Sequence, residues 1–62
     1  MVIKAKFIGR PVLGYETNKE YSLHVSNFKS MTIRRIDGTG ECPYESLSSF
    51  FKNWDDIKQL NL

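Results

Sequence analysis

One cysteine and one histidine are the residues of this 62-residue chain that could support nucleophilic catalysis. A catalytic cysteine needs a base within hydrogen-bond reach and a pocket that holds the substrate. His24 lies between Leu23 and Val25 in an alternating segment, which places its imidazole on the solvent face, whereas Cys42 points with Tyr44. A Cys42–His24 pair would therefore require two faces to meet. We expect a small core thiol, a solvated imidazole and a protein that is not an enzyme.

Metal and nucleotide sites are not predicted either. The chain lacks the four cysteine or histidine ligands of a structural zinc site. Asp55 and Asp56 are adjacent, so their side chains diverge, and the acidic spacing that surrounds a hard cation is absent. The glycine-containing loop at residues 38–40 is followed neither by the Lys-Ser/Thr of a phosphate-binding loop nor directly by a helix start. We expect no cofactor, no metal and a hairpin turn at this loop.

The distribution of charge is more informative. The net charge is +2, but residues 1–40 hold seven basic and three acidic side chains, and residues 41–62 hold two basic and four acidic ones. A basic sheet face with an aromatic residue beside it can contact a phosphate backbone. Dedicated nucleic-acid domains usually carry a stronger bias, so nucleic-acid binding is the alternative hypothesis, beside a solvated mixed-charge face. Its candidate residues are Lys4, Lys6, Lys29, Arg34 and Arg35, with Phe28 as a stacking platform.

Aromatic residues in the expected loops favour a protein interface. Tyr15 and Phe28 lie outside the periodic segments, and exposed aromatic side chains commonly anchor protein interfaces. With the neighbouring basic residues they form the candidate binding set: Tyr15, Phe28, Lys29, Arg34 and Arg35. The leading hypothesis is that these residues contact a protein partner.

The elements that must position these residues begin with strands. Residues 2–8 and 20–26 alternate between apolar and polar, as half-buried strands do, and residues 31–36 are rich in β-branched side chains. A short fourth strand is expected at residues 41–44. In the third segment Ile33 and Ile36 are three positions apart, so either a bulge restores the register or both faces of the sheet are partly covered.

The period changes after residue 44. Ser46 is the expected N-cap of a helix, with a start one turn earlier at Pro43 as the alternative. The helix carries an apolar stripe at helical spacing: Leu47, Phe50, Phe51, Trp54 and Ile57. Residues 53–56 are poor helix formers and should end it. Residues 57–62 are expected to form either a frayed turn or a short edge strand that closes the sheet.

The expected fold is a single α+β domain over residues 1–62. It has a small curled antiparallel sheet of four to five strands, an SH3-like partly open barrel, with one C-terminal amphipathic helix packed on it. A lone cysteine forms no internal disulfide that could stabilise so small a core. A third hypothesis is therefore that the chain associates into a homo-oligomer, which would enlarge the core. No apolar run reaches the length of a membrane span, so we expect a cytoplasmic protein with no membrane partner.

Several segments resemble the small accessory proteins encoded by phages and prophages of Gram-positive bacteria. The resemblance lies in KAKFIG at residues 4–9, LGY at 13–15, KEY at 19–21 and above all CPYESL at 42–47, which leads into Phe50 and Asn53-Trp54. It implies a protein that acts by binding a host protein, or sometimes DNA, and it carries over no active site. The prediction is a small non-enzymatic binding module, phage or prophage encoded, that binds and modulates a host protein in the host cytoplasm.

Overall fold

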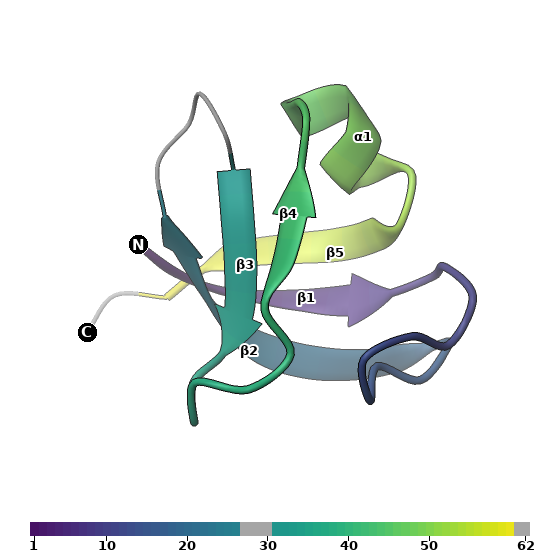
Figure 1. Ribbon diagram of the computed structural model, residues 1–62, viewed down its shortest axis with the longest axis horizontal. Coiled ribbons are helices and arrows are strands. Elements are labelled where there is room, and N and C mark those ends of the chain that lie inside the picture. Colours follow the sequence, from purple (N-terminus) through teal and green to yellow (C-terminus); the bar gives the residue numbers. More distant parts are fainter. Residues whose placement is uncertain (27–30, 61–62) are drawn as a thin grey trace.

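A computed structural model of the chain describes residues 1–26 and 31–60. Within them the elements are β1 (Val2–Phe7), β2 (Lys19–Ser26), β3 (Met31–Arg35), β4 (Cys42–Tyr44), α1 (Leu47–Phe51) and β5 (Trp54–Gln59) (Figure 1). The strands form one antiparallel sheet in the order β4-β3-β2-β1-β5. β4 and β5 are its edges, and the sheet is not closed. The expected small antiparallel sheet with one helix is confirmed, although the domain is mostly β and its helix is very short.

Alternation in the sequence produces the buried face of the sheet. The three central strands each turn every second side chain inward, and the buried residues are Ile3, Ala5 and Phe7 of β1, Leu23 and Val25 of β2, and Met31 and Ile33 of β3. Successive side chains of a strand point to opposite faces, so the residues between them face away from the core. The four predicted strands are confirmed to within one residue at each end.

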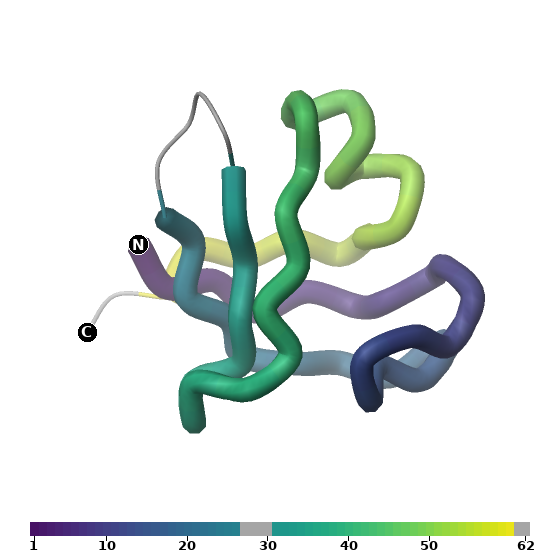
Figure 2. The backbone as a smooth tube through the Cα atoms, viewed as in Figure 1, coloured from purple at the N-terminus to yellow at the C-terminus, as the bar shows by residue number. Residues whose placement is uncertain are grey.

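The sheet is strongly curled because the two ends of β2 pair with different strands. Residues 19–24 of β2 pair with β1, and residues 23–26 pair with β3. The backbone tube bends sharply along β2, so that β1 and β5 run across the view while β3 and β4 run upright (Figure 2). The concave side of this curl holds the core.

The register of β3 resolves the spacing of its two isoleucines. β3 pairs with β2 without a shift from Thr32 to Arg35, so no bulge is present there. Arg35 continues the inward series of Met31 and Ile33, and Ile36 follows the strand with 48% of its surface exposed. Neither of the two predicted explanations is correct, because an arginine rather than an isoleucine occupies the last inward position.

The predicted helix is wrong beyond Phe51. Ser46 is its N-cap, as expected, and its hydroxyl accepts a hydrogen bond from the Ser49 amide. α1 ends after five residues, and Trp54 begins β5 instead of a third helical turn. Of the helix's apolar side chains only Phe50 is buried. The edge-strand alternative is confirmed for residues 57–59, but the strand starts three residues earlier than expected, at Trp54, and it does not close the sheet.

Aromatic rings fill the centre of the core. Trp54 packs edge-on against Phe7 and Tyr15, with ring centroids 5.0 and 5.2 Å apart, and stacks on Phe50 at 5.9 Å. Its indole N–H donates to the Tyr44 hydroxyl at 2.9 Å, which satisfies the polar atom that a buried tryptophan carries. Burial raises the pKa of the Tyr44 hydroxyl. These aromatic rings form much of the core, because the short helix α1 contributes only one buried side chain, Phe50.

Candidate functional site

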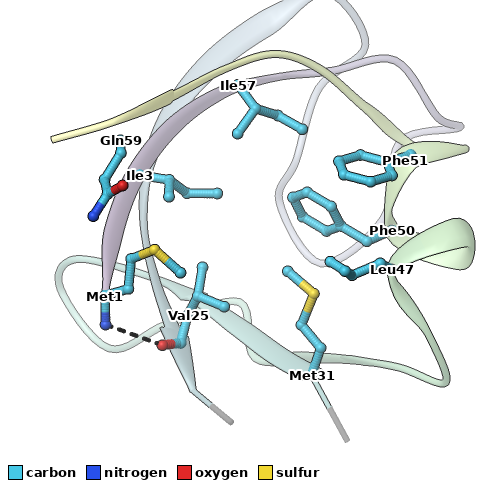
Figure 3. Close-up of a pocket in the computed structure, with 9 residues that line it drawn as sticks. All are labelled: Met1, Ile3, Val25, Met31, Leu47, Phe50, Phe51, Ile57 and Gln59. Atoms are coloured by element: carbon cyan, nitrogen blue, oxygen red, sulfur yellow. Dashed lines mark hydrogen bonds between the residues drawn. The ribbon is translucent and has the colours of Figure 1, made fainter. Parts of the chain in front are cut away.

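An apolar cavity opens at one end of the curled sheet, beside α1. Its volume is about 310 Å³. Side chains from four strands or their ends and from α1 point toward one another around it (Figure 3): Met1, Ile3, Val25, Met31, Leu47, Phe50, Phe51, Ile57 and Gln59. Ile3, Phe50 and Met31 are buried and form its floor, whereas Leu47 and Phe51 are exposed by 47% and 53%. We call this feature the apolar cavity.

The short helix and a bulge in β5 create the rim of the apolar cavity. α1 is too short to lay its apolar stripe across the sheet, so Leu47 and Phe51 remain half in solvent. The pairing of β5 with β1 shifts between Lys4 and Lys6, and Asp56 in the bulge has a φ of +50°. The shift lets Ile57 line the apolar cavity although Trp54, three positions earlier, also faces the core. Exposed apolar residues around a concave site are typical of interaction surfaces.

Tyr15 does not stand on the surface. Its exposed fraction is 1%, so the expectation that this ring anchors a partner from a loop is wrong. Val12 and Tyr15 pair across a tight turn in which Leu13 and Gly14 have φ values of +53° and +83°. These positive angles at both central positions define a two-residue hairpin turn, and the turn folds the ring back onto the core. The Tyr15 hydroxyl donates to the Gly40 carbonyl at 2.8 Å, and burial raises its pKa.

Arg35 lies flat on the Tyr15 ring rather than on the outer face. Its guanidinium carbon is 4.5 Å from the ring centroid, and its Nε donates to the Thr39 hydroxyl at 2.9 Å. The Thr39 amide and hydroxyl donate in turn to Asp37, which lowers the pKa of that carboxyl. Within the described residues the buried Nη1 atom of Arg35 has no hydrogen-bond partner. Arg35 therefore acts as a packing residue between two loops, and its place in both candidate sets is not supported by this position.

Two glycines make room for the Arg35 guanidinium. A Cβ at Gly40 would lie 2.7 Å from the guanidinium carbon and 2.8 Å from the Tyr15 hydroxyl, and a Cβ at Gly14 would lie 3.1 Å from Nη2. Both glycines have positive φ, at +72° and +83°. At these two positions the backbone of the loops before β2 and after β3 thus approaches the charged group closely. We call this arrangement the arginine clamp: Arg35, Tyr15, Gly14 and Gly40.

The predicted basic face is only partly assembled. Lys4 and Arg34 are exposed and lie on the convex side of the sheet, as expected. Lys6 is half-buried and stands directly opposite two acidic residues, Glu20 of β2 and Asp55 of β5. Residues directly opposite in an antiparallel pair share one face, so the charge of Lys6 is offset locally. Phe28 and Lys29 lie outside the described residues.

Two further residues join Lys4 and Arg34 that were not among the sequence-derived candidates. Lys58 is the cross-strand partner of Lys4, and His24 is the cross-strand partner of Arg34. The sequence allows two conformations for residues 57–62, which include Lys58, and it predicts His24 as a solvated residue. We call these four residues the outer basic cluster. The alternation of β2 already placed His24 on this face, whereas only the pairing of β5 could show Lys58 there.

The described residues show no constellation for metal chemistry. No group of three or more His, Cys, Asp or Glu side chains within residues 1–26 and 31–60 could hold a metal ion. Cys42 is opposite Ile33 on the core side of β4, and His24 is on the convex side of β2. No helix in this part of the chain is long and apolar enough to cross a membrane.

The chain was compared with protein-family models, curated proteins and solved structures. The chain matches no protein-family model, no curated protein and no solved structure.

Proposed function

We propose that the protein is a non-enzymatic binding module that receives a large apolar side chain of a host protein in the apolar cavity. The observation that carries this proposal is the half-exposed rim of Leu47, Phe51 and Ile57 above a buried apolar floor. Ligand sites are mostly apolar concavities, and about 300 Å³ is enough for one or two large side chains. Binding rather than catalysis is favoured because the lining contains only one polar side chain, Gln59.

The partner is a short segment of another protein rather than a second copy of this chain. A stable protein interface usually engages about 20–30 residues on each side, and the rim offers only a few. The residues adjoining the rim in sequence include Glu45 and Asp56 against Lys52 and Lys58, whereas segment 41–62 as a whole holds four acidic and two basic side chains. The acidic balance of this segment favours an apolar side chain flanked by basic residues. The phage or prophage origin of the module is supported by its resemblance to accessory proteins of that class.

An SH3-like barrel is the finer description of the fold that we propose with this function. The strand order, with β1 between β2 and β5 and the short α1 between β4 and β5 in sequence, supports it. A small barrel of this kind keeps its core filled and presents its open end to a ligand.

The test uses a pair of peptides that differ at one position. One carries a phenylalanine flanked by lysines, and its control carries alanine in place of the phenylalanine. We expect the phenylalanine peptide to shift the nuclear magnetic resonances of Phe50, Met31 and Ile57, and to bind more than about tenfold tighter than the alanine peptide, since burial of a phenylalanine contributes about 1.5–3 kcal/mol.

Matched variants locate the binding to the apolar cavity. Ile57→Ser should weaken the phenylalanine peptide about tenfold, whereas Ile36→Ser, at an exposed isoleucine outside the apolar cavity, should leave affinity unchanged. Equal affinity for both peptides, or unchanged affinity in a folded Ile57→Ser protein, contradicts the proposal. Self-association that Phe51→Ser abolishes, measured by sedimentation, would instead assign the rim to a second copy of this chain.

A further inference from the structure

The outer basic cluster places two pairs of basic side chains directly opposite each other. Lys4 of β1 faces Lys58 of β5, and His24 of β2 faces Arg34 of β3. Like charges opposite each other in a sheet destabilise it, whereas opposite charges at the same positions would stabilise it. The arrangement thus carries an energetic cost that the fold itself does not require.

No acidic side chain in the described residues forms an ion pair with the outer basic cluster. The single ion pair in residues 1–26 and 31–60 joins Lys19 to Glu16, and none of the four cluster residues donates a side-chain hydrogen bond there. Glu20 and Asp55, the acidic residues of this face, lie opposite Lys6 instead. Carboxylates and unpaired basic groups are therefore separated along the strands, and the basic end is available to an anionic ligand.

The dimensions of the outer basic cluster fit a row of phosphates. It extends over four neighbouring strands, from Lys58 on β5 to Arg34 on β3. Three inter-strand spacings of about 4.8 Å give about 14 Å measured along the curved sheet. One strand of duplex DNA carries a phosphate about every 3.4 Å along its axis, so the cluster is long enough to contact more than one phosphate.

We propose that the outer basic cluster binds the phosphate backbone of a nucleic-acid duplex. In the described residues the convex face carries Val2, serines and Thr32 around the basic groups, and no Phe, Tyr or Trp. Single-strand binding usually depends on aromatic stacking platforms, and base reading depends on side chains that enter a groove. The sheet face offers neither, so the contact is with the backbone and is independent of sequence. This site lies on the convex side, away from the apolar cavity, and goes beyond the function proposed above.

Salt dependence of duplex binding tests this proposal. The probe is a fluorescein-labelled mixed-sequence DNA duplex of about 16 base pairs, followed by anisotropy between about 20 and 200 mM NaCl. With Lys4, Lys58 and Arg34 each contacting one phosphate, the logarithm of affinity should fall against that of salt with a slope of about −2.7. The double variant Lys4→Gln/Lys58→Gln should reduce the slope to about −0.9.

A control with the same change in net charge separates the site from general attraction. Arg10→Gln/Lys52→Gln removes two exposed basic groups outside the outer basic cluster and should leave the slope unchanged. Folding of both double variants is verified by Trp54 fluorescence and urea midpoint.

Four outcomes overturn the proposal. They are no binding at the lowest salt, an equal loss in the control variant, tighter binding of the corresponding single strand, and competition by polyglutamate at equal charge concentration. The last outcome would assign the cluster to an acidic protein. Peptide binding in the apolar cavity is unaffected by these variants, so the two proposals fail independently.

Discussion

Gly40→Ala should destabilise the protein far more than Gly38→Ala, although both glycines lie in one turn and both have positive φ. At Gly38, with φ +90°, a Cβ would meet no atom within 4 Å, so the cost is backbone strain alone, about 1–2 kcal/mol. At Gly40, with φ +72°, the same strain applies, and the Cβ would also lie 2.7 Å from the Arg35 guanidinium. The backbone of Gly14 is also close to the guanidinium, since a Cβ there would lie 3.1 Å from Nη2, so we expect the guanidinium to move off the Tyr15 ring.

The additional cost follows from the contacts of the arginine clamp. A guanidinium over an aromatic ring contributes about 0.5–2 kcal/mol. Loss of the Tyr15–Gly40 and Arg35–Thr39 hydrogen bonds costs about 1 kcal/mol each. We therefore expect Gly40→Ala to cost about 2.5–4 kcal/mol more than Gly38→Ala, out of a total stability of about 3–9 kcal/mol for a chain of this size.

Urea unfolding followed by Trp54 fluorescence measures this difference. A double-mutant cycle with Arg35→Ala identifies its cause, because in that background the Cβ at position 40 no longer displaces a guanidinium. The cost of Gly40→Ala should then fall, but it should stay above that of Gly38→Ala because the new Cβ would still lie 2.8 Å from the Tyr15 hydroxyl. Equal costs for the two glycine variants, or a Gly40→Ala cost that Arg35→Ala leaves unchanged, would refute the role of the arginine clamp.

Two further predictions concern charge and pH. Lys58→Glu should raise the free energy of unfolding by about 0.5–1 kcal/mol, because it places an opposite charge beside Lys4, whereas Lys52→Glu at the end of α1 should not; a lower urea midpoint for Lys58→Glu contradicts this. Burial raises the pKa of Tyr15 and of Tyr44 above the ordinary value of 10.0, so their contribution is complete below about pH 10 and lost as pH rises through the raised values. Unfolding free energies that stay level from about pH 9 to pH 12 would contradict this assignment.

The strands could be predicted because one physical rule decides them. Where every second side chain is apolar, a sheet with one buried face is the structure that removes those side chains from water, and β1 and β2 obey this rule throughout. Ser46 was equally predictable, since a serine before an apolar turn satisfies the free amides of a helix start.

The helix was predicted to extend past Phe51 because a bulged strand can place apolar residues at helical spacing. Trp54 and Ile57 are three positions apart, as on a helix, but the register shift in β5 turns both toward the core side. A bulge is decided by the partner strand, and the pairing of β5 with β1 joins residues distant in the sequence. The same long-range pairing sets Lys58 beside Lys4, so this one of the four residues of the outer basic cluster was not accessible to local patterns.

Tyr15 and Arg35 were misplaced for a different reason. A tyrosine in a loop and an arginine at a strand end are usually exposed, and local patterns give no sign that two loops will close over them. The turn at Leu13-Gly14 lacks the Asn-Gly pair that commonly marks such a hairpin, so its backward fold onto the core was not evident. The glycines that admit the Arg35 guanidinium acquire meaning only once that packing is known.

The position of β1 between β2 and β5 affects the order in which the protein folds. β1 to β4 pair in chain order, but β5 adds to the free side of β1, and Phe7 meets Trp54 across about 50 residues of chain. Closure of so long a loop is entropically unfavourable until the strand contacts that follow it have formed. Local hairpins can therefore form early, whereas the aromatic core waits for the last strand. We therefore expect that closure to govern the refolding rate of this small domain, and refolding to be slower than that of a helical bundle of equal length.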